Sequence, residues 1–127
     1  MIIDLNHVNI VTDKVDETRE FFERVLGLKA GYRPPFDFDG AWLYVGDKPV
    51  VHLQALDSSF NAKPSERGAA GPLDHASFEV TDIAVAKARL DENAITYRAI
   101  TSPDGRNHQL FFREPNGVVI ELIARAR

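Results

Sequence analysis

The chain has 127 residues, of which 44% are hydrophobic and 27% charged, with a formal net charge of −4 at pH 7 and no cysteine. This composition is that of a globular protein rather than a disordered chain, and its apolar runs are too short to cross a bilayer. The acidic balance argues against nucleic acid or an anionic membrane as partner, so we expect a small-molecule ligand. The beginning of the sequence lacks the pattern of a secretory signal, which predicts a cytoplasmic protein.

The first half of the sequence predicts a strand, a helix and three further strands. Residues 4–11 form a short apolar-rich run around His7, and the Thr12-Asp13 pair after it is a good helix N-cap. Helical spacing continues to Val25, and Gly27 suits the turn that ends a helix. Three β-rich runs follow, at residues 28–33, 41–45 and 50–56.

The second half repeats this plan. Residues 73–80 form a run around His75, the Thr81-Asp82 pair is a second N-cap signal, and a helical pattern runs from Ile83 to Asn93. Strands are expected at residues 96–101, 109–113 and 118–124. The prediction is an α+β fold made of paired βαβββ modules, with the helices on the apolar faces of the strands.

The repeat also predicts the domain organisation. The first module spans residues 1–56 and the second residues 72–127. Residues 57–71 are rich in Ser, Ala, Gly, Pro and Asn and lack periodicity, which is typical of a linker. Modules of this size bury too little apolar surface to be stable alone, so the two are expected to pack together.

Alternation along the strands places four side chains on equivalent faces. Val51 and Leu53 should point away from His52, as Ile120 and Leu122 should point away from Glu121. The histidines of the first strands follow the same rule, and each first-strand histidine lies 45 or 46 residues before its last-strand partner. The expected polar set is His7, His52, His75 and Glu121.

These four residues predict a metal site. A chain without cysteine can bind a metal only through histidine, carboxylate and water, and three imidazoles with one carboxylate suit Zn, Fe, Ni, Mn or Co. A single strand histidine is more often structural than a ligand. The appearance of all four at repeat-related positions favours the metal.

Several stretches carry a resemblance to a known family. They are residues 4–7, Phe21-Phe22, Leu26-Gly27-Leu28, Leu73-Asp74-His75 and, most specifically, residues 112–122. With them the chain resembles the vicinal oxygen chelate superfamily, which includes glyoxalase I, fosfomycin-resistance transferases, extradiol dioxygenases and bleomycin-resistance proteins. The resemblance implies that the paired βαβββ modules form a cup-shaped mixed sheet with the helices on the outside. It also implies a metal at the base of the cup, held by His7, His75 and Glu121, with a fourth ligand from the place of His52.

The fourth position departs from glyoxalase I, where the resemblance implies a glutamate that also moves the substrate proton. Here it is His52. The prediction is a metal-dependent, glyoxalase-like lyase or isomerase acting on a small substrate that chelates the metal through vicinal oxygens, with Glu121 and His52 as catalytic residues. The other three ligands look like the two-histidine, one-carboxylate triad of an extradiol-type Fe(II) dioxygenase, which is one alternative. A non-catalytic binding or resistance protein is the other.

Two further expectations concern the substrate and the assembly. Side chains near the rim or on middle strands that could contact the substrate are Arg33, Phe38, Trp42, Tyr44 and Arg113. For the two strand aromatics a half-buried structural role is equally compatible with the pattern. The resemblance includes dimers that exchange modules, and the linker is long enough for this, so we expect a homodimer with sites shared between chains.

Overall fold

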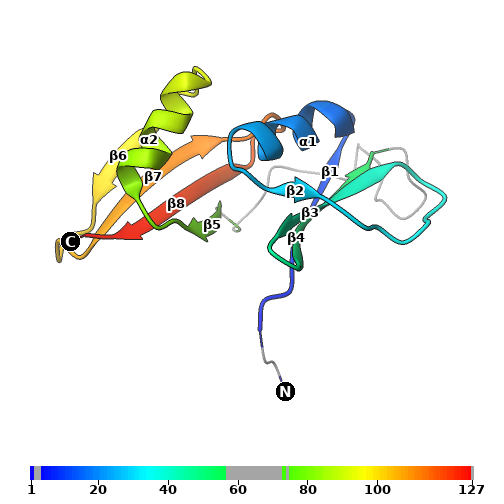
Figure 1. The fold of residues 1–127 in the computed structure, drawn as a ribbon, viewed down its shortest axis with the longest axis horizontal. Coiled ribbons are helices and arrows are strands. Elements are labelled where there is room, and N and C mark those ends of the chain that lie inside the picture. The colour runs from blue at the N-terminus through cyan, green and yellow to red at the C-terminus, as the bar shows by residue number, and fades with distance from the viewer. Residues whose placement is uncertain (2–3, 57–72, 74, 127) are drawn as a thin grey trace. The chain divides into compact units, whose positions relative to one another are not determined.

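The structure is a computed structural model that describes residues 1, 4–56, 73 and 75–126 (Figure 1). The chain divides into two compact units, residues 1–69 and 70–127. The predicted linker, residues 57–71, lies outside the described residues.

The first unit contains one helix and a four-stranded mixed sheet. Strand β1 runs parallel to β4, whereas β4 with β3 and β3 with β2 are antiparallel, in the order β1-β4-β3-β2. The elements are β1 Val8–Thr12, α1 Val15–Arg24, β2 Lys29–Ala30, β3 Gly40–Val45 and β4 Lys48–Ala55. The two-residue connection between β3 and β4 contains Gly46, whose φ of +60° favours glycine.

The second unit repeats this topology in the order β5-β8-β7-β6, with β5 parallel to β8 (Figure 1). Its elements are β5 His75–Glu79, α2 Ile83–Glu92, β6 Arg98–Thr101, β7 Asn107–Arg113 and β8 Val119–Arg125. The prediction of an α+β fold built from paired βαβββ modules is confirmed.

Each unit has its core between the helix and one face of the sheet. In the first unit Phe22, Leu43 and Val51 are fully buried, and in the second Leu90 and Leu110 are. The residues that alternate with these strand positions, including His52, lie on the other face. The predicted alternation is therefore confirmed, because a strand with one buried face must turn every second side chain away from the core.

The two helices begin differently, although both were expected to start on a capping aspartate. The Asp82 carboxylate accepts hydrogen bonds from the backbone N–H groups of Ala84 and Val85, at 2.8 and 3.2 Å. Helix α1 instead has Lys14 as N-cap and no side-chain cap, so the expectation for the Thr12-Asp13 pair is wrong. Thr12 belongs to β1 and is buried, and its hydroxyl accepts from the Lys14 N–H.

Four predicted strands are shorter than expected, at residues 4–11, 28–33, 73–80 and 96–101, and the first two bear on the candidate site. The run at residues 28–33 forms a strand only at Lys29 and Ala30. After one more hydrogen bond, from the Gly31 N–H to the Trp42 backbone oxygen at 3.1 Å, the chain leaves the sheet, and the two prolines that follow have no N–H group with which to rejoin it. The first strand begins at Val8 rather than residue 4, so His7 directly precedes it. Residues 31–39 form a connection without regular structure, and it carries Arg33.

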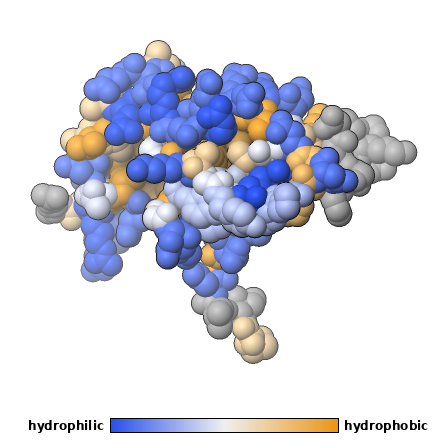
Figure 2. Space-filling view, turned by 45° about the vertical axis from the view of Figure 1, so that its right-hand side comes forward, coloured by the Kyte–Doolittle hydropathy of each residue, from blue (hydrophilic) through white to orange (hydrophobic). Residues whose placement is uncertain are grey.

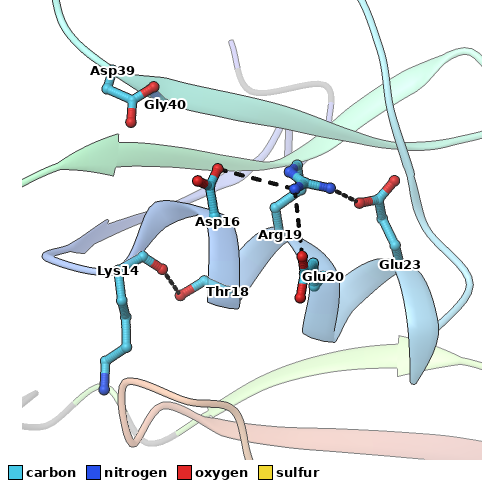
Figure 3. A network of polar contacts seen from close by, with 8 residues as sticks. All are labelled: Lys14, Asp16, Thr18, Arg19, Glu20, Glu23, Asp39 and Gly40. Atoms are coloured by element: carbon cyan, nitrogen blue, oxygen red, sulfur yellow. Dashed lines mark hydrogen bonds and ion pairs between the residues drawn. The ribbon is translucent and has the colours of Figure 1, made fainter.

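The exposed face of α1 is occupied by its own charges. Arg19 forms ion pairs with Asp16, Glu20 and Glu23, as Figure 3 shows. Exposed pairs of this kind contribute little stability and keep the helix surface hydrated. Hydrophilic residues also cover much of the surface in Figure 2, with hydrophobic atoms between them. No helix in the described part of the chain is long and apolar enough to cross a membrane.

Candidate functional site

The first unit brings His7 and His52 into a stack of three rings with Trp42. Trp42 on β3 is the cross-strand partner of His52 on β4, and their ring centroids lie 3.9 Å apart with an interplanar angle of 11°. The His7 ring stacks on His52 with centroids 3.7 Å apart and an angle of 10°. The His52 imidazole therefore lies flat between an indole and a second imidazole.

Hydrogen bonds determine which ring nitrogens keep a lone pair. The Nε2 atom of His52 lies 3.1 Å from the backbone oxygen of Pro49, and because a carbonyl only accepts, Nε2 carries the proton and Nδ1 the lone pair. Burial lowers the pKa of His52, and the neighbouring His7 lowers it further, while the bond to Pro49 opposes both. The imidazole is therefore held neutral at pH 7.

The second unit brings His75 and Glu121 together. His75 Nε2 lies 3.2 Å from Glu121 Oε1, at the start of β5 and in the middle of β8. The other carboxylate oxygen, Oε2, accepts a hydrogen bond of 2.7 Å from the side-chain amide of Gln109 on β7. Glu121 is buried, so these two contacts hold a carboxylate that has little access to water.

The two units differ in how well their donors suit a divalent metal. In the second unit the His75 imidazole nitrogen and a Glu121 carboxylate oxygen point toward each other. Such a pair suits Zn, Fe, Ni, Mn or Co. The parallel rings of His7 and His52 do not, because an ion in the plane of one ring lies out of the plane of the other. For both to bind one ion, one ring must turn.

Each unit alone supplies two donors. Among the described residues, no group of three or more histidine, aspartate or glutamate side chains lies close enough to hold one ion. The second unit thus provides a preformed N,O pair, and the first provides His7 beside a His52 whose Nε2 is already bonded.

Gln109 contacts the candidate residue Glu121 and was not predicted from the sequence. Phe111 is the cross-strand partner of Glu121, as Trp42 is of His52, so Gln109 corresponds to Gly40 in the repeat. Alternation places Gln109 on the face of Phe111 and Glu121. This alternation could have identified Gln109. The repeat-equivalent residue in the first unit is a glycine, however, so comparing the two halves did not indicate a polar side chain at this position.

The five predicted substrate-contacting residues separate into two groups. Arg33, Phe38 and Trp42 lie in one cluster of aromatic and guanidinium groups in the first unit, linked through Phe36. The Tyr44 hydroxyl donates to the backbone oxygen of Tyr32 at 2.6 Å. Arg113 lies in the second unit, is exposed, and donates to the Gly117 backbone oxygen at 2.7 Å.

The most specific string of the sequence shapes a turn. Glu114 is buried between β7 and β8, and its carboxylate accepts from the N–H groups of Asn116 and Val118 and from the Asn116 side-chain amide, at 2.7–2.9 Å. Gly117 completes the turn with a φ of +86°. This turn leads the chain into β8 and so positions Glu121.

The sequence and the fold both have relatives among known proteins. Residues 4–122 match the model of the Glyoxalase/Bleomycin resistance protein/Dioxygenase superfamily. The chain is 36% identical over 125 residues to Glyoxylase I 4 of Arabidopsis thaliana. The matched region covers 95% of this chain and 70% of that protein.

Two solved structures illustrate the likeness in fold. Lactoylglutathione lyase from Agrobacterium tumefaciens superimposes with a TM-score of 0.72 at 21% identity, covering 95% of this chain and 92% of that one. A variant of the fosfomycin resistance protein FosX from Listeria monocytogenes, complexed with Mn(II) and a dihydroxypropylphosphonic acid, gives 0.73 at 13% identity, covering 99% and 95%.

Proposed function

Because the chain belongs to the Glyoxalase/Bleomycin resistance protein/Dioxygenase superfamily, we propose that it is a metal-dependent, glyoxalase-like lyase or isomerase. Its substrate would be a small molecule with two neighbouring oxygens that chelate the metal. The proposed ligands are His7, His75 and Glu121, with His52 as a fourth ligand or as the base beside them. The cytoplasm is its proposed location.

The observation that carries this proposal is the preformed pair in the second unit. Glu121 is a buried carboxylate whose two oxygens face His75 and Gln109, at 3.2 and 2.7 Å. A buried carboxylate is costly unless it is paired, and a divalent cation would complete its pairing. When bound, the cation would stabilise negative charge developing on the substrate oxygens.

His52 is the proposed proton acceptor. Its lowered pKa keeps the ring neutral near pH 7, and the bond from Nε2 to Pro49 leaves the lone pair on Nδ1. A neutral imidazole beside a substrate C–H that is acidified by the cation can take the proton and return it to a neighbouring carbon. This role corresponds to that of the glutamate which the family resemblance implies for glyoxalase I.

Arg33, Phe38 and Trp42 are the proposed substrate contacts in the first unit, because Trp42 stacks on His52 and Phe36 links the other two to Trp42. Tyr44 and Arg113 stay predictions. Their polar atoms bond to backbone oxygens, which is also compatible with purely structural roles.

An extradiol-type Fe(II) dioxygenase is the second candidate. The bond from His52 Nε2 to Pro49 and the stacking on Trp42 hold the His52 ring in place. A His52 that stays in this stack as a base and not as a ligand would leave the two-histidine, one-carboxylate triad with open positions, which favours this candidate.

Metal analysis of the protein purified without added metal, followed by anaerobic Fe(II) loading, tests the proposal. Zinc, nickel, manganese or cobalt with oxygen-independent turnover of a 2-oxo or 2-hydroxy compound supports the lyase or isomerase. Iron with oxygen-dependent catechol cleavage supports the dioxygenase. Absence of stoichiometric metal under all loading conditions would reject both in favour of a binding protein.

Variants locate the metal. His75→Ala and Glu121→Ala should each abolish stoichiometric binding, because each removes a donor from the preformed pair. His108→Ala is the matched control, since it removes another histidine from the same unit. His108 is not a proposed ligand, and its Nδ1 lies beside the Thr101 hydroxyl. Unchanged metal content in both ligand variants would reject the assignment.

The functional unit in this proposal is a homodimer with sites shared between chains. A chain carrying His7→Ala and His52→Ala is mixed with one carrying His75→Ala and Glu121→Ala, and the two are unfolded and refolded together. Modules exchanged between chains would regenerate one intact site per mixed dimer. Sites built within one chain would leave the mixture unable to bind metal, and a monomer by light scattering would reject the dimer.

A further inference from the structure

Arg33 lies in an aromatic clamp on the connection between β2 and β3. Its guanidinium carbon is 4.9 Å from the ring centroid of Phe36 and 5.0 Å from that of Phe38. The two rings stack on each other with centroids 5.0 Å apart, and Arg33 Nη2 donates to the backbone oxygen of Phe38 at 2.8 Å. These contacts hold the guanidinium in one orientation.

The charge of Arg33 has no carboxylate partner in the part of the chain that the structure describes. No ion pair joins it to Asp37 or Asp39, although both are close in sequence and the net charge of the chain is −4. Its Nε is buried and has no acceptor among the described residues. Such an atom is rare in folded proteins and calls for an explanation, because losing water without gaining an acceptor costs free energy.

Gly40 makes room for the guanidinium. A Cβ at this position would lie 2.9 Å from Arg33 Nη2, 3.1 Å from Arg33 Nε and 2.3 Å from the backbone oxygen of Leu53. Any larger residue would have to displace both Arg33 and the neighbouring strand. The second unit has Gln109 at the repeat-equivalent position, so this arrangement is particular to the first unit.

The clamp continues as a row of rings toward the candidate metal donors. Phe36 lies 6.3 Å from Trp42, and Trp42 stacks on His52 at 3.9 Å. Phe36 is 44% exposed and Trp42 is half-buried, so part of the row is open to solvent. A flat ligand lying along this row would have one end at Arg33 and the other beside His52.

We propose that Arg33, Phe36 and Trp42 form a binding subsite for a substrate that carries a carboxylate on an aromatic or conjugated group. The planar guanidinium matches the two oxygens of a carboxylate, and its charge has no carboxylate partner among the described residues. The flat group packs on Phe36 and Trp42. This inference rests on the proposed function, because it assumes that the molecule bound at the subsite is the substrate of that reaction.

Trp42 is the only tryptophan of the chain and reports directly on this subsite. The metal-free full-length protein is titrated with phenylacetate and, in parallel, with the neutral phenylacetamide, with excitation of Trp42 at a wavelength that neither ligand absorbs. Phenylacetate should change the fluorescence saturably, with a Kd at least about tenfold lower than that of phenylacetamide, because only the carboxylate pairs with Arg33.

Three variants separate the charge from the aromatic surface. Arg33→Gln should raise the Kd for phenylacetate about tenfold and leave that for phenylacetamide unchanged. Phe36→Leu should weaken both ligands. Arg98→Gln, which removes an exposed arginine of the second unit, is the matched control and should change neither.

Equal affinity of the wild-type protein for the two ligands would overturn the proposal, as would no saturable signal, and neither result depends on any variant folding. Full phenylacetate binding by a folded Arg33→Gln protein would do the same. Metal content is measured on the same preparations. Phenylacetate binding by a protein that takes up no metal would leave the subsite standing and reject the proposed function alone.

Discussion

The side-chain amide of Gln109 donates a 2.7 Å hydrogen bond to Oε2 of Glu121, the carboxylate oxygen not facing His75. Each oxygen of the buried carboxylate therefore has a different neighbour. A ligating carboxylate is commonly oriented by such a partner, and loss of the partner weakens metal binding without removing a ligand. Gln109 is thus a positioning residue for the proposed site.

Replacing Gln109 by leucine should lower metal affinity by about 10- to 100-fold, because Glu121 is then free to turn away from His75. Affinity is measured by competition with a chelator on the purified protein. Gln54→Leu is the control, since it removes a side-chain amide of the first unit that accepts a hydrogen bond from Asn9. Equal affinity of Gln109→Leu and wild-type protein would show that the bond is only structural.

Replacing Glu114 by alanine should reduce the free energy of unfolding by about 1.5–3 kcal/mol. The buried carboxylate accepts three hydrogen bonds in the turn before β8, and two of them come from backbone N–H groups that would lose their acceptor. Urea unfolding followed by circular dichroism measures the change. Glu17→Ala, at an exposed position of α1, should stay within about 0.5 kcal/mol of wild type. A loss no larger than this at Glu114 would contradict the assigned role.

The two repeat-equivalent aspartates before the helices should differ in their effect on stability. Asp82→Ala should cost about 1 kcal/mol, because Asp82 caps two N–H groups of α2. Asp13→Ala should change the free energy of unfolding by less than about 0.5 kcal/mol, since α1 has no side-chain cap. Urea unfolding of both variants under one condition makes the comparison. Equal losses would mean that Asp13 contributes in a way that the structure does not show.

The pKa of His52 in the metal-free protein should lie below its ordinary value of 6.5, mainly because of burial and secondarily because of His7. A folded-state pKa below the unfolded one means that the unfolded chain binds more protons, so this contribution to stability is complete above pH 6.5 and is lost as the pH falls through the folded pKa. Titration of the ring followed by NMR gives the midpoint, and His7→Ala should raise it. His52→Gln should unfold with a weaker pH dependence between about pH 7.5 and 5. A wild-type midpoint at or above 6.5 would contradict the assignment.

The amino-acid sequence by itself determined the two βαβββ units and the inward and outward faces of their strands. It could do so because burial of one sheet face imposes a period of two on every strand, and this period is visible at residues such as Val51, His52 and Leu53. Repetition of the same pattern also identified His52 and Glu121 as equivalent positions.

Only the tertiary structure decided which neighbours these side chains acquire. Gln109 meets Glu121 because of the register of β7 on β8, and Trp42 covers His52 because of the register of β3 on β4. Arg33 reaches its clamp because the chain leaves the sheet after β2 and Gly40 leaves space for the guanidinium. Alternation along one strand determines which face a side chain occupies, whereas the neighbour that it meets depends on pairing with another strand and on the path of the loops.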